Sequence, residues 1–288
     1  MTDTLSIFYL ISIILGLAFQ NIAKKPYTDK VGGKGVYFFS LLTSLGAMLF
    51  FIVTSSGFEW EPGLILYSFM FALSYGLAIV FMTVAVSCGS LSFTSLVVSY
   101  SLMLPTVYGL LWLHDTMSVG FIPGLVLLAA SLVLINKKGE GAHSRITFKW
   151  VVSAFLSFLG NGMCSVVQKM QQVQFDGGYK NEFMIIALAM VTIMMAVLFI
   201  VQERKEAKSY AVAGWHLALG CGVMNGIVNL FVMILSGRMP VSLMFPLISA
   251  GGIVVTFLVS KLFYKENFTK SQLAGFIIGT VSVVFLNI

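Results

Sequence analysis

Ten long apolar segments, separated by short polar connections, occupy nearly the whole of this 288-residue chain. They cover residues 5–23, 36–53, 64–86, 91–113, 119–135, 150–168, 183–201, 211–235, 241–263 and 273–288. A helix needs about 20 mostly apolar residues to cross the roughly 30 Å hydrocarbon core of a bilayer, and these segments suit that length. We therefore predict an all-α polytopic membrane protein with ten transmembrane helices.

The composition leaves no room for a separate soluble domain. Hydrophobic residues make up 58% of the sequence and charged residues only 10%. No segment carries the paired acids, histidine cluster or Ser–Lys dyad of an intramembrane enzyme, so we do not expect an enzyme. The three cysteines and three histidines are scattered without metal-ligand spacing, and we therefore expect neither a metal nor a cofactor.

The ends of the two halves of the sequence are similar to each other. The segments that follow Asp115 and Glu266 align without a gap at a shift of 151 positions, which pairs Gly124 with Gly275, Ser131 with Ser282, Val133 with Val284, and Asn136 with Asn287. We therefore divide the chain into two five-helix repeats, 1–138 and 139–288, with a polar linker at about 136–149. Five crossings are an odd number, so the second repeat is inverted, an arrangement that many secondary transporters share.

The same positions carry a resemblance to a known family. The first half contains Ala85, Gly89-Ser90, Pro105, the run LHDTMS at 113–118 and Gly124, and the second half contains the run LFYKENFT at 262–269, Gln272, Gly275 and Gly279. This pattern resembles the EamA type of the drug/metabolite transporter superfamily, although Asp115 stands at the first acidic position instead of Glu. The resemblance implies a ten-helix carrier of small metabolites, amino acids or drug-like molecules.

The basic residues are distributed unequally between the two predicted sides of the membrane. Fourteen of the 17 Lys and Arg residues lie in the connections after the first, fifth, seventh and ninth segments, and three lie on the other side. The positive-inside rule then predicts a multi-pass protein of the cytoplasmic (plasma) membrane with both termini outside. The family resemblance implies cytoplasmic termini instead. We also assign the net charge of +6 to topology and expect no nucleic-acid partner.

Uncharged polar residues inside the apolar segments are the candidates for a substrate site. All eleven acidic residues lie outside the segments or at their edges, which argues against a buried proton-relay carboxylate and a permanently cationic substrate. Polar groups in hydrocarbon need a partner or a cavity. The predicted substrate-binding residues are Gln20, Asn21, Tyr75, Ser99, Tyr100, Asn161, Gln168, Lys169, Asn225 and Asn229. Their alternative role is helix–helix hydrogen bonding, or for Lys169 an interfacial position.

Six further positions have predicted mechanical or structural roles. Pro105 and Pro246 lie inside the fourth and ninth segments, where a proline kinks a helix and can form a hinge. Asp115 and Glu266 precede the fifth and tenth segments, and we expect each carboxylate to stabilise the N-terminus of the helix that follows it. Gly124 and Gly275, at equivalent places in those segments, are predicted to serve helix packing.

These features predict a secondary transporter that works by alternating access. Its cargo would be an amino acid or another neutral, zwitterionic or anionic metabolite, with export favoured over uptake. Two alternatives stay open: a flippase for a lipid-linked substrate, and a non-transporting membrane sensor or assembly protein. The expected partners are a small-molecule substrate and the lipid bilayer, and both a monomer and a homodimer are compatible with the sequence.

Overall fold

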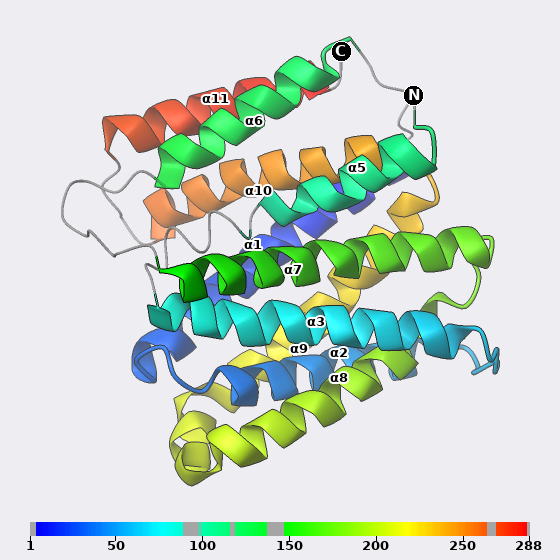
Figure 1. The fold of residues 1–288 in the computed structure, drawn as a ribbon, viewed down its shortest axis with the longest axis vertical. Helices are drawn as coiled ribbons and strands as arrows, with labels where there is room; N and C mark the ends of the chain where they lie inside the picture. Colours follow the sequence, from blue (N-terminus) through cyan, green and yellow to red (C-terminus); the bar gives the residue numbers. More distant parts are fainter. Residues whose placement is uncertain are drawn as a thin grey trace. The chain divides into compact units, whose positions relative to one another are not determined.

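The computed structural model describes residues 4–88, 98, 100–115, 119–136, 147–263 and 269–286. These residues form ten α-helices, two 3₁₀ turns and no strand (Figure 1). The helices are α1 (Thr4–Lys30), α2 (Val36–Thr54), α3 (Leu64–Cys88), α5 (Met103–Trp112), α6 (Phe121–Asn136), α7 (Phe148–Gln174), α8 (Lys180–Gln202), α9 (Ala207–Ser236), α10 (Val241–Phe263) and α11 (Lys270–Leu286), with the 3₁₀ turns η1 (Tyr100–Leu102) and η2 (Arg204–Glu206). The all-helical prediction is confirmed for this part of the chain.

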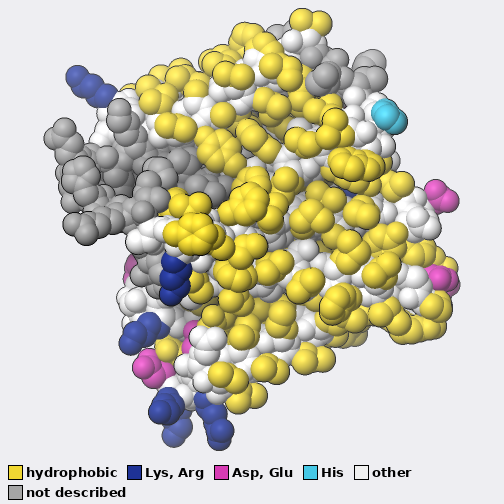
Figure 2. Space-filling view, viewed as in Figure 1, with side chains coloured by type: hydrophobic (Ala, Val, Ile, Leu, Met, Phe, Trp, Pro, Cys, Tyr) yellow, Lys and Arg dark blue, Asp and Glu magenta, His cyan; other side chains and the backbone are white. Residues whose placement is uncertain are grey.

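Six helices are long and apolar enough to cross a membrane, namely α1, α2, α3, α7, α8 and the continuous stretch of η2 and α9. Shorter apolar stretches lie in α6, α10 and α11. Large hydrophobic side chains such as Val53 and Ile193 are exposed at 82% and 66%, and hydrophobic side chains dominate the visible described surface (Figure 2). Exposing this much apolar area to water is unfavourable, whereas lipid tails solvate it readily. The chain is therefore a helical membrane protein.

The helices form two compact units, and each unit draws on both halves of the sequence. Unit 1 comprises Met1–Gly76 and Val167–Gly237, and unit 2 comprises Leu77–Val166 and Arg238–Ile288. Two of the three boundaries between them fall inside α3 and α7, so these two helices each contribute one end to either unit, and the third lies between α9 and α10.

In unit 1, α2 packs against both α8 and α9, and α9 also packs against α1. Small residues allow α2 and α9 to approach closely, because a Cβ atom added to Gly46 would lie 2.8 Å from the carbonyl oxygen of Leu219, and one added to Gly222 would meet the carbonyl oxygen of Thr43. Gly222 of α9 and Gly46 of α2 therefore serve helix packing within the chain.

In unit 2, α6 packs along α11, and α10 packs against α5 and α11. Two serine hydroxyls join α6 to α11. Ser131 Oγ donates to the carbonyl oxygen of Gly275 at 2.6 Å, and Ser271 Oγ donates to that of Leu134 at 3.1 Å. Gly124 and Gly275 are both buried, as the packing role predicted for them requires.

Two segment boundaries differ from those expected of the sequence. Helix α1 continues through Pro26 to Lys30 instead of ending near residue 23, so the basic residues after that position are helical. The described part of the fourth segment consists of η1 followed by α5. Pro105 is the third residue of α5, which directly follows η1, and Pro246 lies inside α10.

Candidate functional site

Four side-chain amides from three helices of unit 1 form one continuous hydrogen-bonded chain, which we call the amide ladder. Gln168 Nε2 on α7 donates to Asn229 Oδ1 on α9 at 2.7 Å. Asn229 Nδ2 donates to Asn225 Oδ1 at 2.9 Å, and Asn225 Nδ2 donates to Gln20 Oε1 on α1 at 3.2 Å. Four of the ten predicted substrate-binding residues therefore meet, and Asn225 and Asn229 share one helix face, as their spacing predicts.

The ladder has a single direction, because each amide donates to the next from α7 towards α1. At its α7 end, Gln168 is buried and its Nε2 also lies 3.8 Å from the sulfur of Met184. At its α1 end, Gln20 Nε2 donates to the carbonyl oxygen of Gly16 at 3.4 Å. Asn229 makes a second bond to the backbone oxygen of Asn225 at 2.8 Å, which joins the ladder to α9 itself.

The ladder offers neutral donors and acceptors. A carboxamide has two N–H donors and an oxygen with two lone pairs. Each of the four amides can therefore form further hydrogen bonds beyond those within the ladder. Within the described ranges, every side chain that bonds to a ladder amide is itself uncharged. Such a site suits recognition by hydrogen bonds more than by ion pairing.

Lys169, next to Gln168, serves the end of a helix. Its Nζ donates to the carbonyl oxygen of Ser236, the last residue of α9, at 2.6 Å. A cation at a helix C-terminus bonds to carbonyl groups that lack a helical partner and is favoured by the helix dipole. This contact places Lys169 at the edge of unit 1 and accounts for a charge near a spanning segment.

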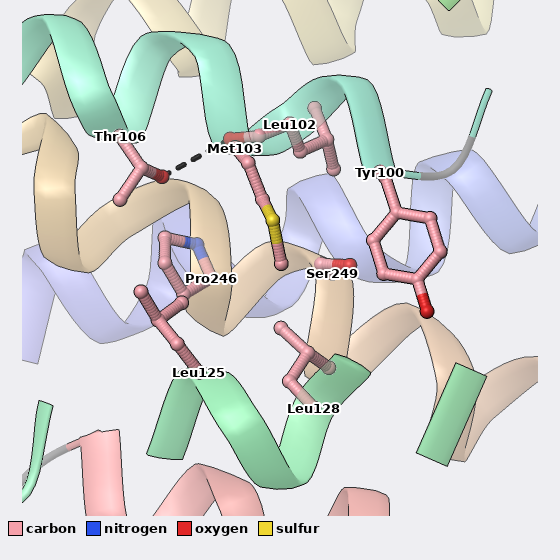
Figure 3. Close-up of a pocket in the computed structure, with 8 residues that line it drawn as sticks. All are labelled: Tyr100, Leu102, Met103, Thr106, Leu125, Leu128, Pro246 and Ser249. Carbon is pink, nitrogen blue, oxygen red and sulfur yellow. Dashed lines mark hydrogen bonds between the residues drawn. The ribbon is translucent and has the colours of Figure 1, made fainter. Parts of the chain in front are cut away.

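A second set of predicted residues lies in unit 2, around a small pocket (Figure 3). The pocket is lined by Tyr100, Leu102, Met103, Thr106, Leu125, Leu128, Pro246 and Ser249. Its cavity volume of about 10 Å³ suits about one water molecule and no metabolite. The hydroxyl of Tyr100 donates to the carbonyl oxygen of Ala129 at 2.8 Å, and that of Thr106 donates to Leu102 at 3.0 Å. Both hydroxyl groups thus donate their proton to a backbone carbonyl oxygen.

The other predicted residues lie apart from the ladder or outside the described residues. Asn161 is in unit 2, where its Nδ2 donates to Ser101 Oγ at 2.6 Å. Tyr75 is half-buried in unit 1 and stacks on Phe71 with ring centroids 6.4 Å apart. Ser99 and the side chain of Asn21 lie outside the described residues.

One carboxylate in each unit holds the start of a helix that is distant in sequence. Asp115 Oδ2 accepts a hydrogen bond from the backbone N–H of Ser242 at 3.0 Å, in the first turn of α10. Asp115 therefore contacts the start of α10, and residues 116–118, which lead towards α6, lie outside the described residues. In unit 1, the carboxylate of Glu203 accepts the N–H groups of Tyr37 and Phe38 at 3.2 and 2.8 Å, at the start of α2. Glu266 lies outside the described residues.

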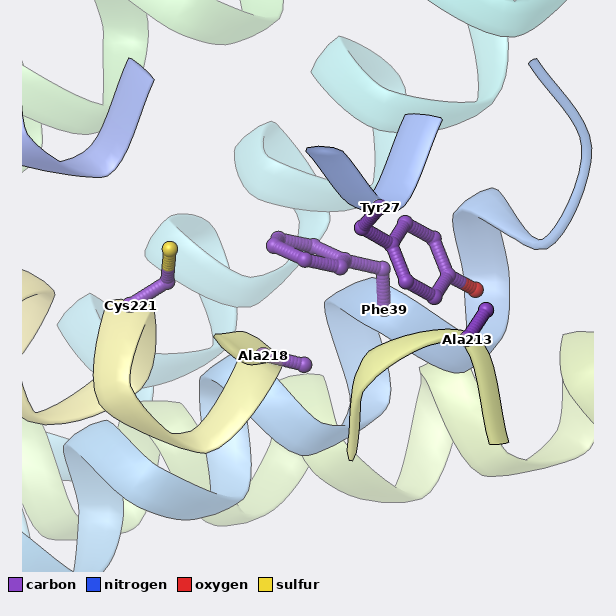
Figure 4. Packing of buried hydrophobic residues seen from close by; sticks show 5 residues of the cluster. All are labelled: Tyr27, Phe39, Ala213, Ala218 and Cys221. Atoms are coloured by element: carbon purple, nitrogen blue, oxygen red, sulfur yellow. The ribbon is translucent and has the colours of Figure 1, made fainter. Parts of the chain in front are cut away.

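A cluster of buried aromatic and small residues packs at the end of unit 1 near Glu203 (Figure 4). Tyr27 and Phe39 pack with ring centroids 4.8 Å apart against Ala213 and Ala218. The hydroxyl of Tyr27 donates to the carbonyl oxygen of Gly35 at 2.9 Å. Burial, together with the nearby carboxylate of Glu203, raises the pKa of Tyr27, so that its hydroxyl stays protonated and keeps this bond.

Some polar contacts were not anticipated. Glu203 shows only as an acid after an apolar segment, and nothing in the sequence points to α2, which begins 167 positions earlier. Gln171 and Gln172 are buried at the end of α7, and the Oε1 atom of Gln172 has no hydrogen-bond partner among the described residues. Three glutamines within five residues at the end of an apolar segment were the available signal. The described residues hold no group of three or more His, Cys, Asp or Glu suited to a metal.

Comparison with known proteins places the fold and leaves the activity open. No protein-family model matches the chain. An uncharacterized protein of Haemophilus influenzae is 26% identical over 191 residues, which are 64% of this chain and 62% of that protein, so the match spans less than two thirds of the relative. A protein of known crystal structure superposes with a TM-score of 0.79 over 99% of this chain and 96% of its own, at 14% identity. This likeness shows a shared fold.

Proposed function

We propose that this protein is a secondary carrier for a small metabolite and that the amide ladder is part of its substrate site. The observation that carries the proposal is the chain of four amides across α1, α7 and α9, all helices long enough to span a membrane. Polar groups within hydrocarbon need partners. Amide–amide bonds can be exchanged for bonds to a ligand, because each amide both donates and accepts.

The packing of the helices supports an origin by duplication and, we propose, ten crossings as two inverted repeats. Helix α2 packs with α8, α5 with α10, and α6 with α11. In each pair, one helix comes from residues 1–138, and the other occupies the same place in the order of 139–288. A duplicated chain folds in this way when equivalent helices meet near a symmetry axis. We place the protein in the cytoplasmic membrane with both termini outside, from the distribution of Lys and Arg.

The cargo that suits the ladder is neutral or zwitterionic, and an anionic metabolite stays within the proposal. The pocket near Pro246 takes about one water molecule, whereas sites for small molecules typically occupy about 300–1,000 Å³. The pocket near Pro246 is therefore not the proposed substrate site. We propose that transport proceeds by alternating access, with Pro246 as a hinge. We favour export over uptake, from the resemblance to the EamA-type transporters.

A second function is favoured by the saturation of the ladder. Each of its amides already has a protein partner, as expected of polar contacts that only hold helices together. Such bonds contribute about 0.6–2 kcal/mol each in membrane proteins. A membrane sensor or assembly protein without transport activity would need no more than this.

Flux through proteoliposomes separates the two functions. Thermal unfolding of the purified chain against amino acids, sugars, nucleobases and organic anions first selects compounds that stabilise it, since a bound ligand raises the unfolding temperature. Uptake of the selected compound is then compared between the wild type, Asn225→Leu in the ladder and the control Thr192→Val. The control removes the hydrogen bond from Thr192 to Ser44 (3.0 Å) in the same unit.

We expect saturable flux that Asn225→Leu abolishes and Thr192→Val preserves. Flux of no compound above empty vesicles, with the protein folded, contradicts transport of small metabolites. Activity confined to vesicles that contain a lipid-linked saccharide identifies a flippase instead. Equal loss of flux in both variants would show that the ladder is not part of the substrate site. The losses would then reflect a general effect of polar contacts on folding.

A further inference from the structure

Two helices of unit 1 are longer than a bilayer core requires, and their excess lengths meet at one end. Helix α1 has 27 residues, which correspond to about 40 Å, against a hydrocarbon core of about 30 Å. Helix α9 has 30 residues, and its first turns precede a break at Gly214 that separates them from the long apolar part. The end of α1 and the start of α9 are joined, because Lys30 Nζ donates to the carbonyl oxygen of Ala213 at 3.3 Å. This end of unit 1 therefore extends to the level of the lipid headgroups.

The joined ends carry five exposed cations, which we call the basic end: Lys30, Lys34, Arg204, Lys205 and Lys208. Three acids lie nearby, and two of them are engaged. Glu203 accepts the N–H groups at the start of α2. Glu206 accepts a hydrogen bond from the hydroxyl of Tyr210 at 2.9 Å and lies 4.0 Å from Lys34 Nζ. The third acid, Asp29, is exposed, so the basic end keeps a net positive charge.

The side chains of three cations of the basic end, Arg204, Lys205 and Lys208, form no hydrogen bond or ion pair with any described residue. They are exposed in η2 and the first turn of α9. Three like charges within five residues of sequence repel one another, and a bound anion would remove this repulsion.

The helix beside these cations has the features of a membrane interface. Its backbone is interrupted at Gly214, which separates the first turns of α9 from the spanning part. Around this break, Val212 is 86% exposed and Trp215 is 54% exposed. Tryptophan is enriched at the level of the headgroups. Figure 2 shows Lys and Arg side chains gathered at the lower left, where α8 and α9 meet in Figure 1.

We propose that the basic end binds the headgroup of an anionic phospholipid, with Arg204, Lys205 and Lys208 as its phosphate contacts and Trp215 and Val212 beside the upper acyl chains. Arginine can bond two phosphate oxygens at once, and lysine adds a compact charge. Anionic lipids are enriched in the cytoplasmic leaflet and attract basic segments next to membrane helices. This site is independent of the amide ladder and of transport.

Titration of defined lipids into the full chain tests the proposal. The purified protein in neutral detergent micelles is unfolded by heat with increasing phosphatidylglycerol, phosphatidylcholine or inorganic phosphate. Arg204→Gln/Lys208→Gln is compared with Lys149→Gln/Lys270→Gln, which removes two exposed cations outside the basic end that the sequence places on the same membrane side. Both double variants change the net charge equally, and neither touches the ladder.

We expect phosphatidylglycerol to stabilise the wild type at concentrations at which phosphatidylcholine has no effect. Each basic contact near an anionic surface contributes about fivefold to affinity, so Arg204→Gln/Lys208→Gln should raise the half-saturating phosphatidylglycerol concentration about 25-fold. The control should raise it less than threefold. Equal effects of the two lipids, equal losses in the two variants, or full protection by inorganic phosphate would each overturn the proposal, the last by identifying a site for free phosphate.

Discussion

Both units bond serine and threonine hydroxyls to backbone carbonyls, but unit 1 also joins four side-chain amides in series. Ser131 and Ser271 of unit 2 donate to carbonyl oxygens of neighbouring helices, as Ser68 of unit 1 does to Phe183. The ladder from Gln168 to Gln20 has no counterpart among the described residues of unit 2, where the single bond between Asn161 and Ser101 is the nearest equivalent. A hydroxyl bonded to a backbone carbonyl contributes to helix packing. Linked side-chain amides can instead exchange their bonds to each other for bonds to a ligand.

Both units also hold the start of a helix with a carboxylate. The units therefore differ in their side-chain amides and not in how their helices begin. In each, a carboxylate after one helix bonds to the N-terminal turn of a helix from the other half of the sequence, Glu203 at α2 and Asp115 at α10. The two units thus use the same kind of contact to begin a helix and differ in the polar side chains between their helices. The shared contact serves packing, and the ladder is the part that we propose binds substrate.

The largest effect is expected when the ladder is cut in the middle. Asn229→Leu removes an acceptor for Gln168 and donors to Asn225, and unsatisfied buried amides cost about 1–3 kcal/mol each. We expect transport in proteoliposomes to fall at least tenfold. The corresponding change in unit 2, Asn161→Leu, should lower it less than threefold, because it removes the single bond that Asn161 Nδ2 donates to Ser101 Oγ. Similar losses in both variants would erase the functional distinction between the units.

Next in size is the effect of close helix packing, which one glycine of α9 should show clearly. A methyl group at Gly222 would meet the carbonyl oxygen of Thr43 and lie 2.9 Å from the Cα of Gly46, so α2 and α9 would have to separate. Such overpacking costs about 1–3 kcal/mol. We expect Gly222→Ala to lower the thermal unfolding midpoint by several degrees.

Gly220 provides the control on the same helix. An added Cβ there meets nothing within 4 Å, and alanine is the better helix former by about 1 kcal/mol. Gly220→Ala should leave the unfolding midpoint unchanged or raise it slightly. A fall equal to that of Gly222→Ala would mean that the contact between α2 and α9 does not limit stability.

The carboxylate contacts should differ between the units in proportion to their hydrogen bonds. Glu203 accepts two backbone N–H groups and Asp115 accepts one, and loss of a capping side chain costs about 0.5–2 kcal/mol. We expect Glu203→Ala to destabilise more than Asp115→Ala in thermal unfolding, with Glu203→Gln between the wild type and Glu203→Ala. A greater loss for Asp115→Ala would reverse the ranking and point to a role of Asp115 beyond the start of α10.

The positions of the helices could be predicted from the sequence because apolar length alone decides them in a bilayer. The shared face of Asn225 and Asn229 was predictable as well, since it follows from helical spacing. Their partners were not, because Gln20 and Gln168 meet them only through tertiary packing. The same reason hid the contact of Asp115 with α10. A carboxylate before a helix suggests a local cap, and only the fold reveals that a helix start 127 positions later lies within hydrogen-bonding distance.

The smallest expected effect concerns two serines at equivalent places of the repeats. Both are fully buried, but Ser131 Oγ donates to Gly275 on α11, whereas Ser282 Oγ donates to Gly279 of its own helix at 2.7 Å. Interhelical hydrogen bonds in membrane proteins contribute on average about 0.6 kcal/mol, and a bond within one turn adds little to packing. We expect Ser131→Ala to lower the unfolding midpoint by about one or two degrees and Ser282→Ala to leave it unchanged. Equal shifts would show that the bond from Ser131 to Gly275 adds nothing beyond burial, and the contact between α6 and α11 would then rest on their apolar side chains and on the bond from Ser271 to Leu134.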